Sequence, residues 1–385
     1  MLSAVVVTGT GDSVAVDGFV TLREAITSIN NGVDINADVT AVGTYGNNDT
    51  INFNIAGAGV QRISPASPLP TVVNPVAING YSQPGTSANT LANSDNAVLL
   101  IELNGTDAGN GLVLGAGSDG SSVSGLVINS FTGTGILVQS NGNTIVGNFI
   151  GTNVAGNLGL SITGAFGIGI DGRFRNTIGG TTPAARNVIG GNSDGINLNT
   201  GSQNTVIQGN FIGLGADGTT AVGNRLHGVA LRGNGGLGVQ NNVIGGIAAG
   251  AGNTIANNGS AGVAVFGDAA SIRQNSSNAI LGKSIFNNGL SSPGTLLGID
   301  LVAATSYPTD DGATANDSGD GDSGPSLLQN LPVLTSVTSD LVSTTVVGSL
   351  NSNAKRWRSC PRTSPKPPKP PDPRPSLRRC PPSRA

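Results

Sequence analysis

A short phrase, glycine followed by two aliphatic residues one position apart, recurs six times in this chain. The copies start 28 to 36 residues apart and read Gly135-Ile-Leu-Val138, Gly167-Ile-Gly-Ile170, Gly195-Ile-Asn-Leu198, Gly228-Val-Ala-Leu231, Gly262-Val-Ala-Val265 and Gly298-Ile-Asp-Leu301. A repeating unit of this length is typical of a solenoid or a propeller. The periodicity therefore constrains the fold more than any other feature of the sequence.

Asparagine marks two further positions in each repeat. One series is Asn143-Thr-Ile145, Asn176-Thr-Ile178, Asn204-Thr-Val206, Asn242-Val-Ile244 and Asn278-Ala-Ile280, and the other is Asn148-Phe-Ile150, Asn187-Val-Ile189, Asn210-Phe-Ile212, Asn253-Thr-Ile255 and Lys283-Ser-Ile285. Each repeat thus holds three β-branched segments that are too short to be helices. Three strands per turn predict an all-β fold, a parallel β-helix, with asparagine side chains hydrogen-bonded along its corners.

Alternation along each strand predicts which side chains face the core. Ile136 and Val138 should point inward and Leu137 outward. The equivalent inward pairs form a column that no single turn could bury alone: Ile168/Ile170, Ile196/Leu198, Val229/Leu231, Val263/Val265 and Ile299/Leu301. The same alternation places Ile196 and Asn197 on opposite faces, so aspartate should be tolerated only at residue 197.

The start of the chain predicts a cap. Thr21 and Glu24 have the spacing of a capping box, and an apolar helical face follows it, made of Leu22, Ala25, Ile26 and Ile29. We expect this helix to cover the open end of the apolar column, the alternative being an ordinary surface helix. The expected organisation is a cap over residues 1–50, the β-helix over 51–305, and an Asp-rich loop with a C-terminal β cap over 306–353.

Leu22-Arg-Glu-Ala-Ile26 resembles the SLREAI-type cap motif of secreted bacterial right-handed parallel β-helix proteins. Asp49-Thr-Ile-Asn-Phe53, Pro75-Val-Ala-Ile-Asn-Gly80 and Ile101-Glu-Leu-Asn-Gly105 are similar as well, and the resemblance covers roughly residues 4–350. This chain has Val20 and Thr21 where the motif often has Cys-Ser. The resemblance implies a right-handed β-helix with an extracellular or cell-surface location, and it implies little about chemistry.

Composition limits the partners. Charged residues make up 11% of the chain and the formal net charge is −3, which argues against a nucleic-acid partner. No apolar run is long enough for a membrane span, and no signal peptide is visible. A polysaccharide or a surface protein remains the expected kind of partner.

Groups suited to catalysis are scarce, but two of them share a corner. Asp194 and His227, the only histidine of the chain, each directly precede a glycine of the repeated phrase. They should therefore lie on successive turns about 4.8 Å apart. Arg232 follows within the same repeat as His227, at a position that stacks with Asp171 and Asn199.

Two interpretations of this corner remain open. A carboxylate beside a histidine orients it as a general base, and an arginine binds a uronic-acid carboxylate in bidentate fashion. Asp194, His227 and Arg232 are therefore the candidate catalytic residues. The alternative is a structural pair, because the strip lacks a second carboxylate to act as the partner acid.

Three other features suggest ligands or an unusual terminus. Asp317, Asp320 and Asp322 stand on a Gly- and Ser-rich segment that suits calcium, or else is simply a solvated acidic loop. Phe149 and Phe211 should face outward two turns apart, as a platform for sugars or as a surface packed under loops. Residues 354–385 are basic and Pro-rich and should be disordered, either as a native tail or as a gene region read in the wrong frame.

The sequence thus predicts an extracellular or cell-surface β-helix module that binds a glycan or a protein partner without catalysis. The alternative is a polysaccharide lyase or glycoside hydrolase that acts on an acidic polysaccharide. Calcium is the one cofactor that the sequence suggests.

Overall fold

The computed structural model describes residues 3–47, 49–106, 108–160, 166–233, 237–267, 275–282, 284–290, 297–302, 333–339 and 344–349. The calcium prediction at Asp317, Asp320 and Asp322 lies outside the described residues, and so does the predicted tail at 354–385. Both stay predictions.

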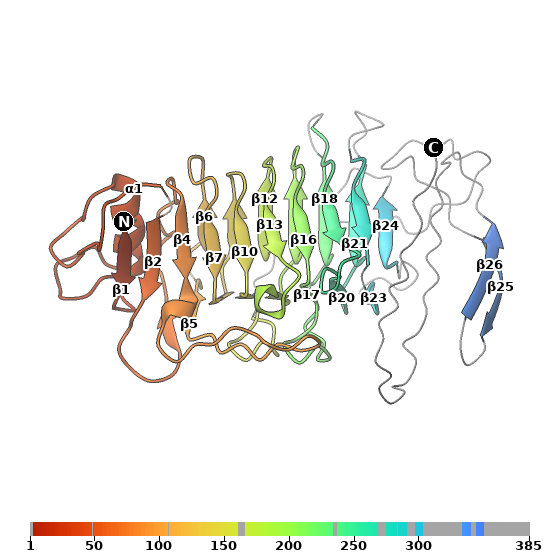
Figure 1. The fold of residues 1–385 in the computed structure, drawn as a ribbon, viewed down its shortest axis with the longest axis horizontal. Helices are drawn as coiled ribbons and strands as arrows, with labels where there is room; N and C mark the ends of the chain where they lie inside the picture. The colour runs from red at the N-terminus through yellow and green to blue at the C-terminus, as the bar shows by residue number, and fades with distance from the viewer. Residues whose placement is uncertain are drawn as a thin grey trace, which may run out of the picture. The chain divides into compact units, whose positions relative to one another are not determined.

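The described repeats form a right-handed parallel β-helix in which the chain visits three parallel sheets in turn (Figure 1). The nine-stranded sheet holds β1 (Ala4–Val7), β2 (Asp49–Phe53), β4 (Val76–Asn79), β7 (Ser122–Ser124), β10 (Thr144–Val146), β13 (Thr177–Gly179), β16 (Val206–Gln208), β19 (Val243–Gly245) and β22 (Ala279–Leu281). The eight-stranded sheet holds β3 (Gln61–Ile63), β5 (Ile101–Asn104), β8 (Leu126–Asn129), β11 (Phe149–Ile150), β14 (Val188–Ile189), β17 (Phe211–Ile212), β20 (Thr254–Ala256) and β23 (Ser284–Phe286). The seven-stranded sheet holds β6 (Leu112–Leu114), β9 (Ile136–Val138), β12 (Ile168–Asp171), β15 (Ile196–Asn199), β18 (Val229–Arg232), β21 (Val263–Phe266) and β24 (Ile299–Val302).

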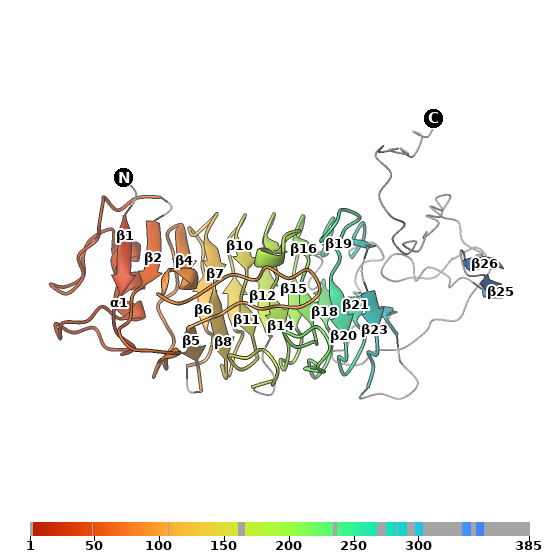
Figure 2. The ribbon, with the colours of Figure 1, turned by 60° about the horizontal axis from the view of Figure 1, so that its bottom comes forward.

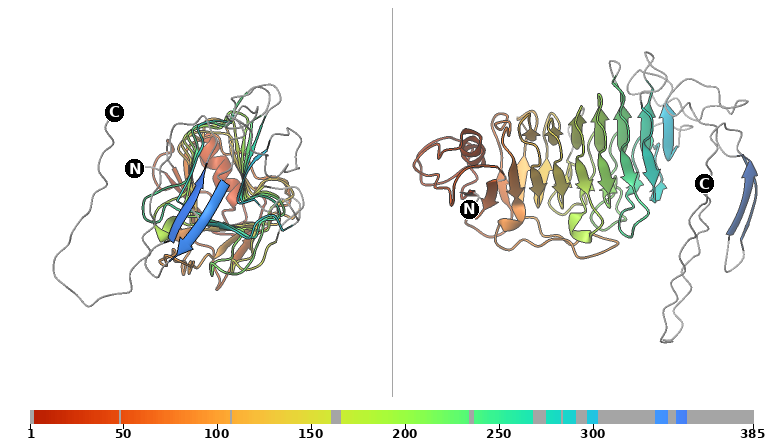
Figure 3. Two further views of the ribbon diagram at one scale, coloured as in Figure 1. Left: turned by 90° about the vertical axis from the view of Figure 1, so that its right-hand side faces the viewer. Right: turned by 45° about the horizontal axis from the view of Figure 1, so that its top comes forward.

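The strand register confirms the predicted core column as far as Val263 and Val265, whereas Ile299 on the last coil is 40% exposed. Ile168 pairs with Ile136 on one side and with Ile196 on the other, and Ile196 pairs in turn with Val229. These side chains are fully buried in one apolar cluster that runs through the coils. Viewed along the stack, the coils superimpose (Figure 3, left). Each coil therefore buries its apolar residues against the coils before and after it.

The predicted segment Asn204-Thr-Val206 is wrong by one residue. In the nine-stranded sheet Ile178 pairs with Ile207, so Ile207 points inward and Val206 outward. Asn204 adopts a positive φ of 55° at the corner, and Thr205 takes the place predicted for the asparagine. A shift of one residue reverses every side chain of a strand, so the aliphatic residue that reaches the core sets the register.

Asparagine side chains do connect successive coils. In the series predicted to include residue 148, Asn148 donates to Asn187, Asn187 to Asn210 and Asn210 to Asn253, over 2.9 to 3.2 Å. A third series, not predicted from the sequence, lies at the next corner, with distances of 2.8 to 3.2 Å between the side chains of Asn192, Asn224, Asn258 and Asn288. These ladders satisfy buried amides that the bends would otherwise leave unpaired.

Helix α1 (Leu22–Asn31) begins and ends as its residues predict. Thr21 and Glu24 form the capping box, and Gly32 ends the helix in the left-handed region. The predicted apolar face is buried in the same cluster as the first coils, which excludes the surface-helix alternative: Leu22, Ala25, Ile26 and Ile29. The end of the column next to β1 and β2 is therefore covered.

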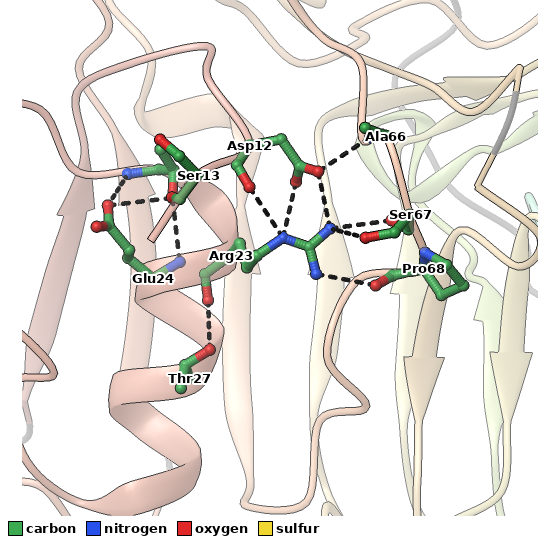
Figure 4. Close-up of polar contacts among 9 residues, drawn as sticks. Asp12, Ser13, Arg23, Glu24, Thr27, Ala66, Ser67 and Pro68 are labelled. Carbon is green, nitrogen blue, oxygen red and sulfur yellow. Dashed lines mark hydrogen bonds and ion pairs between the residues drawn. The ribbon is translucent and has the colours of Figure 1, made fainter. Parts of the chain in front are cut away.

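Arg23 ties the cap to the first coil (Figure 4). Its guanidinium pairs with Asp12 at 2.9 Å and donates to the carbonyl oxygens of Ser67 and Pro68, each at 2.9 Å. The amide of Ala66 donates to the same carboxylate of Asp12 at 2.9 Å. One planar cation thus holds three segments together, which a lysine could not do with the same geometry.

The remaining described strands, β25 (Val333–Ser339) and β26 (Thr344–Ser349), form an antiparallel hairpin in a second compact unit. A C-terminal β cap was predicted over residues 306–353, and both strands lie within that range. No helix in the described part of the chain has the length and apolar character needed to cross a membrane.

Candidate functional site

The repeat brings Asp194 and His227 to one corner, directly before β15 and β18. The amide of Gly195 donates to the carbonyl of His227 at 3.0 Å, so the two corner residues lie on adjacent coils as their spacing predicts. Arg232 ends β18, and its register neighbour on the preceding coil is Asn199. Asp194 and His227 stand before the strands and Arg232 at the far end of β18, so the Arg232 side chain reaches back to bring the three groups together at Asp194.

The carboxylate of Asp194 is the centre of the cluster. Its Oδ1 lies 2.9 Å from Nδ1 of His227 and accepts the backbone amide of the same residue at 3.1 Å. Its Oδ2 accepts Nη1 of Arg232 at 2.8 Å and the side-chain amide of Asn197 at 3.3 Å. A carboxylate at Nδ1 fixes the orientation of the imidazole, which is the arrangement that a general base requires.

Phe266 completes the cluster from the next coil. Its ring meets the imidazole of His227 edge to face, with centroids 5.4 Å apart and planes at 89°. The guanidinium carbon of Arg232 lies 4.7 Å from the centre of the same ring. Phe266 is the register neighbour of Arg232, four residues after its own phrase glycine, so counting along the repeat would have found it.

This cluster, Asp194–His227–Arg232–Phe266, is sealed. The side chains of Asp194 and His227 are 0% exposed and that of Arg232 is 13% exposed. Burial alone would raise the pKa of the Asp194 carboxyl, but the hydrogen bond with His227 and the charge of Arg232 together hold that pKa below its usual value. Asp194 is therefore an ionised buried anchor for its neighbours.

Asp171 does not join the cluster. It pairs in register with Asn199, as predicted, but its side chain is exposed and lies 3.4 Å from the amide of Gln139. Of the two aspartates that the repeat places near His227 and Arg232, only Asp194 therefore contributes its carboxylate to the cluster.

Phe149 and Phe211 face outward from the eight-stranded sheet, yet neither ring is open to solvent. They pair with Val188 from opposite sides and are only 2% and 6% exposed. Loops and the side chains of Leu99 and Leu214 cover them in a second apolar cluster. This environment is the one described by the loop-packing alternative, and it leaves no ring face for a sugar.

Part of that cover is a long loop, residues 83–98, here called the strap, which runs past several coils (orange in Figures 1 and 2). Arg186 holds its tip, because the guanidinium donates to the carbonyl oxygens of Leu91, Ala92 and Ser94 at 3.0, 2.5 and 2.5 Å. The same guanidinium lies 4.2 Å from the centre of the Phe211 ring.

Metal ligands are not grouped in the described part of the chain. No set of three or more His, Cys, Asp or Glu side chains lies there in a position to hold an ion.

The sheet order, the strand register and the capped first coil define a right-handed parallel β-helix protein. A search of solved structures finds similarity to the crystal structure of the Dettilon tailspike protein (gp208), with 15% sequence identity over 88% of this chain and 74% of that chain. The TM-score is 0.30, so this likeness carries no argument about function. No known family and no curated protein matches the sequence.

Proposed function

We propose that this protein is a non-catalytic β-helix module, displayed outside the cell, that binds a glycan on its surface. The observation that carries the proposal is the complete burial of His227 and Asp194. His227 is the only histidine in the chain, so this cluster is the natural place for acid–base chemistry. A general base must come within about 3 Å of the proton that it removes, and a sealed imidazole does not reach a polysaccharide.

The open face of the nine-stranded sheet supports glycan binding. Its outward positions mix hydroxyl and amide groups with small or aliphatic residues and carry, within the described strands, no charged side chain. Eight of the polar residues there are Thr50, Asn52, Asn79, Ser122, Ser124, Thr144, Thr177 and Gln208. Such groups donate and accept hydrogen bonds with sugar hydroxyls without a need for charge. The extracellular location is supported by the resemblance of the cap to that of secreted proteins.

One observation favours the alternative, a polysaccharide lyase or hydrolase. The pairing of Asp194 with Nδ1 of His227 at 2.9 Å has the geometry of an oriented base. This function requires that the segments over the cluster move aside and that Arg232 exchange Asp194 for the substrate carboxylate.

A panel of neutral and acidic polysaccharides, examined with the purified full chain for both binding and cleavage, tests the proposal. We expect saturable binding of at least one glycan and no new reducing ends or unsaturated products. Cleavage that disappears in His227→Gln would establish the enzyme instead. Failure to bind any glycan in the panel would overturn the proposed function.

A further inference from the structure

A pocket of about 280 Å³ opens between the cap and the first coil, far along the chain from the buried cluster. Three segments line it: the residues after β1, those before α1, and the loop between β2 and β3. Its lining residues include Thr10, Asp17, Phe19, Thr21 and Gln61. This size lies at the lower end of the range for ligand pockets and suits a single sugar ring.

The backbone on both sides of the pocket is fixed. The amides of Thr8 and Gly9 donate to the carbonyl of Val20 at 2.9 and 3.1 Å, and the amide of Val20 donates back to the Thr8 hydroxyl at 2.9 Å. A Cβ on Gly9 would lie 2.9 Å from the Cβ of Phe19, so glycine is what lets the Phe19 side chain lie against this segment. The pocket is therefore largely preformed.

Asp38 holds the segment that leads into Phe19. Its Oδ2 accepts the backbone amides of Asp17 and Gly18 at 2.6 and 2.8 Å. The amide of Phe19 donates to Oδ1 of Asp17 at 3.1 Å. These bonds hold the Asp17 carboxylate and the Phe19 ring at one edge of the pocket.

The groups left available in the pocket include an aromatic ring and two hydrogen-bond acceptors. The Phe19 side chain is 54% exposed. Within the described contacts, Oδ2 of Asp17 has no partner, and neither has Oε1 of Gln61, whose Nε2 donates to Gly59 at 3.3 Å. One apolar face beside two acceptors matches a pyranose, which has an apolar C–H face and adjacent hydroxyl donors.

We propose that this cap pocket binds one neutral pyranose unit, with its C–H face on Phe19 and its hydroxyls donating to Asp17 and Gln61. The inference rests on the proposed glycan-binding function and adds a defined sugar site at the cap to the polar face of the nine-stranded sheet. Charge selects the ligand, because Asp17 lines the pocket and Asp38 is bonded to the Asp17 backbone, while Arg23 is paired with Asp12. Uronic acids and phosphates are therefore repelled.

Titration of the full chain with neutral and acidic tetrasaccharides tests this assignment. The probes are cellotetraose, mannotetraose, N-acetylchitotetraose and, as the acid, a tetramer of galacturonic acid. We expect at least one neutral probe to bind, the acidic probe to bind at least tenfold more weakly, and Phe19→Ala to weaken the neutral probe about tenfold, as the loss of one aromatic contact predicts.

Two further variants sharpen the test. Asp17→Asn keeps an oxygen for the Phe19 amide and removes the charge, so it should reduce the discrimination against the acidic probe. Phe174→Ala is the matched control, because Phe174 is an exposed ring (42%) on a distant loop and its loss should leave binding unchanged.

The outcomes separate the two proposals. If a neutral glycan binds and Phe19→Ala binds it as tightly as wild type, the cap pocket is the wrong site and the proposed function stands. If no glycan binds, both proposals fail. A preference for the acidic probe would overturn the pocket assignment even if Phe19→Ala weakens binding.

Discussion

At the scale of single residues, Asp194 stands out because one carboxylate serves both His227 and Arg232. A buried charge gives up its hydration, so it is tolerated only while hydrogen bonds and opposite charge replace the lost water. Asp194→Asn keeps the shape of the side chain and removes that charge. The substitution should therefore report what the ionised form contributes to folding.

We expect Asp194→Asn to lower the free energy of unfolding by about 3 kcal/mol, the usual cost of removing one member of a buried ion pair. Chemical denaturation measures this directly. Asp171→Asn changes an exposed carboxylate on the preceding coil and should cost no more than about 0.5 kcal/mol. Equal losses in the two variants would contradict the role given to Asp194.

The pH dependence of this difference follows from the lowered pKa of Asp194. A carboxyl with a folded pKa below its ordinary 3.8 stabilises the fold fully above that value and loses its contribution as the pH falls through the folded pKa. The gap in melting temperature between wild type and Asp194→Asn should be constant near neutral pH and shrink below about pH 4. A gap that widens in acid would count against this account.

Asn197 shows that the outward side of a strand is not always open. Alternation predicts opposite faces for Ile196 and Asn197, which holds, but both residues are buried (0% and 1% exposed). The Asn197 amide donates to Asp194, so Asn197→Asp would place two carboxylates together. We expect its melting temperature to fall substantially, although less than that of Ile196→Asp. If Asn197→Asp melts at the wild-type temperature, as strand alternation alone predicts, the role given to the Asn197 amide is wrong.

At the scale of elements, the strap is held by a well-placed cation outside it, Arg186, and carries a poorly placed anion of its own, Asp95. Arg186 has carbonyl partners, whereas the buried Oδ2 of Asp95 has no hydrogen-bond partner in the described structure. Burial raises the pKa of the Asp95 carboxyl, against the opposing effects of the Ala97 amide and the Arg186 charge. Tyr81 is the other titratable group beside it, and burial and the Asp95 charge raise the pKa of that phenol as well.

This raised pKa predicts a stability effect of the opposite sign to that of Asp194. Asp95 contributes most below its ordinary 3.8, and the contribution is lost as the pH rises through its folded pKa. Asp95→Asn keeps the oxygen that accepts from Ala97, so it should raise the melting temperature at pH 7 and have little effect near pH 3. Amide hydrogen exchange should show slower opening of the strap in the variant. An unchanged strap at pH 7 would refute the prediction.

Elements were predictable where the pattern is local and repeated. The glycine phrases located the strands of the seven-stranded sheet, while β3 was missed because Ile63 is its one inward aliphatic residue. Periodicity also predicted that Asp194, His227 and Arg232 lie close together. It could not foresee their burial, since strand alternation alone does not say what covers the outer face. The same limit applies to Phe211, which residues 83–98 cover from a different part of the chain.

At the scale of the whole β-helix, the open side of the first coil is protected in two ways. Helix α1 fills the end of the core column, and Ala4 exchanges backbone hydrogen bonds with Val42 at 2.9 and 3.0 Å, so the free edge of β1 is partly occupied. An uncovered edge of this kind would pair with another chain.

We therefore expect Ile26→Asp, which places a charge against the column, to lower the melting temperature and increase association. Ile26 is 1% exposed, and Val33, at 57%, offers the control variant Val33→Asp. Sedimentation velocity at several concentrations measures the association. If Ile26→Asp associates no more than Val33→Asp does, the helix does not protect the end of the stack.

The asparagine ladders have a consequence for how such a molecule changes over generations. Every amide in a series donates to the next coil and accepts from the previous one, so Asn148, Asn187 and Asn210 offer identical connections. A duplicated coil would find a matching donor and acceptor on either side wherever it was inserted. Lengthening the protein then requires no new interface, and gene segments that encode whole coils become interchangeable parts.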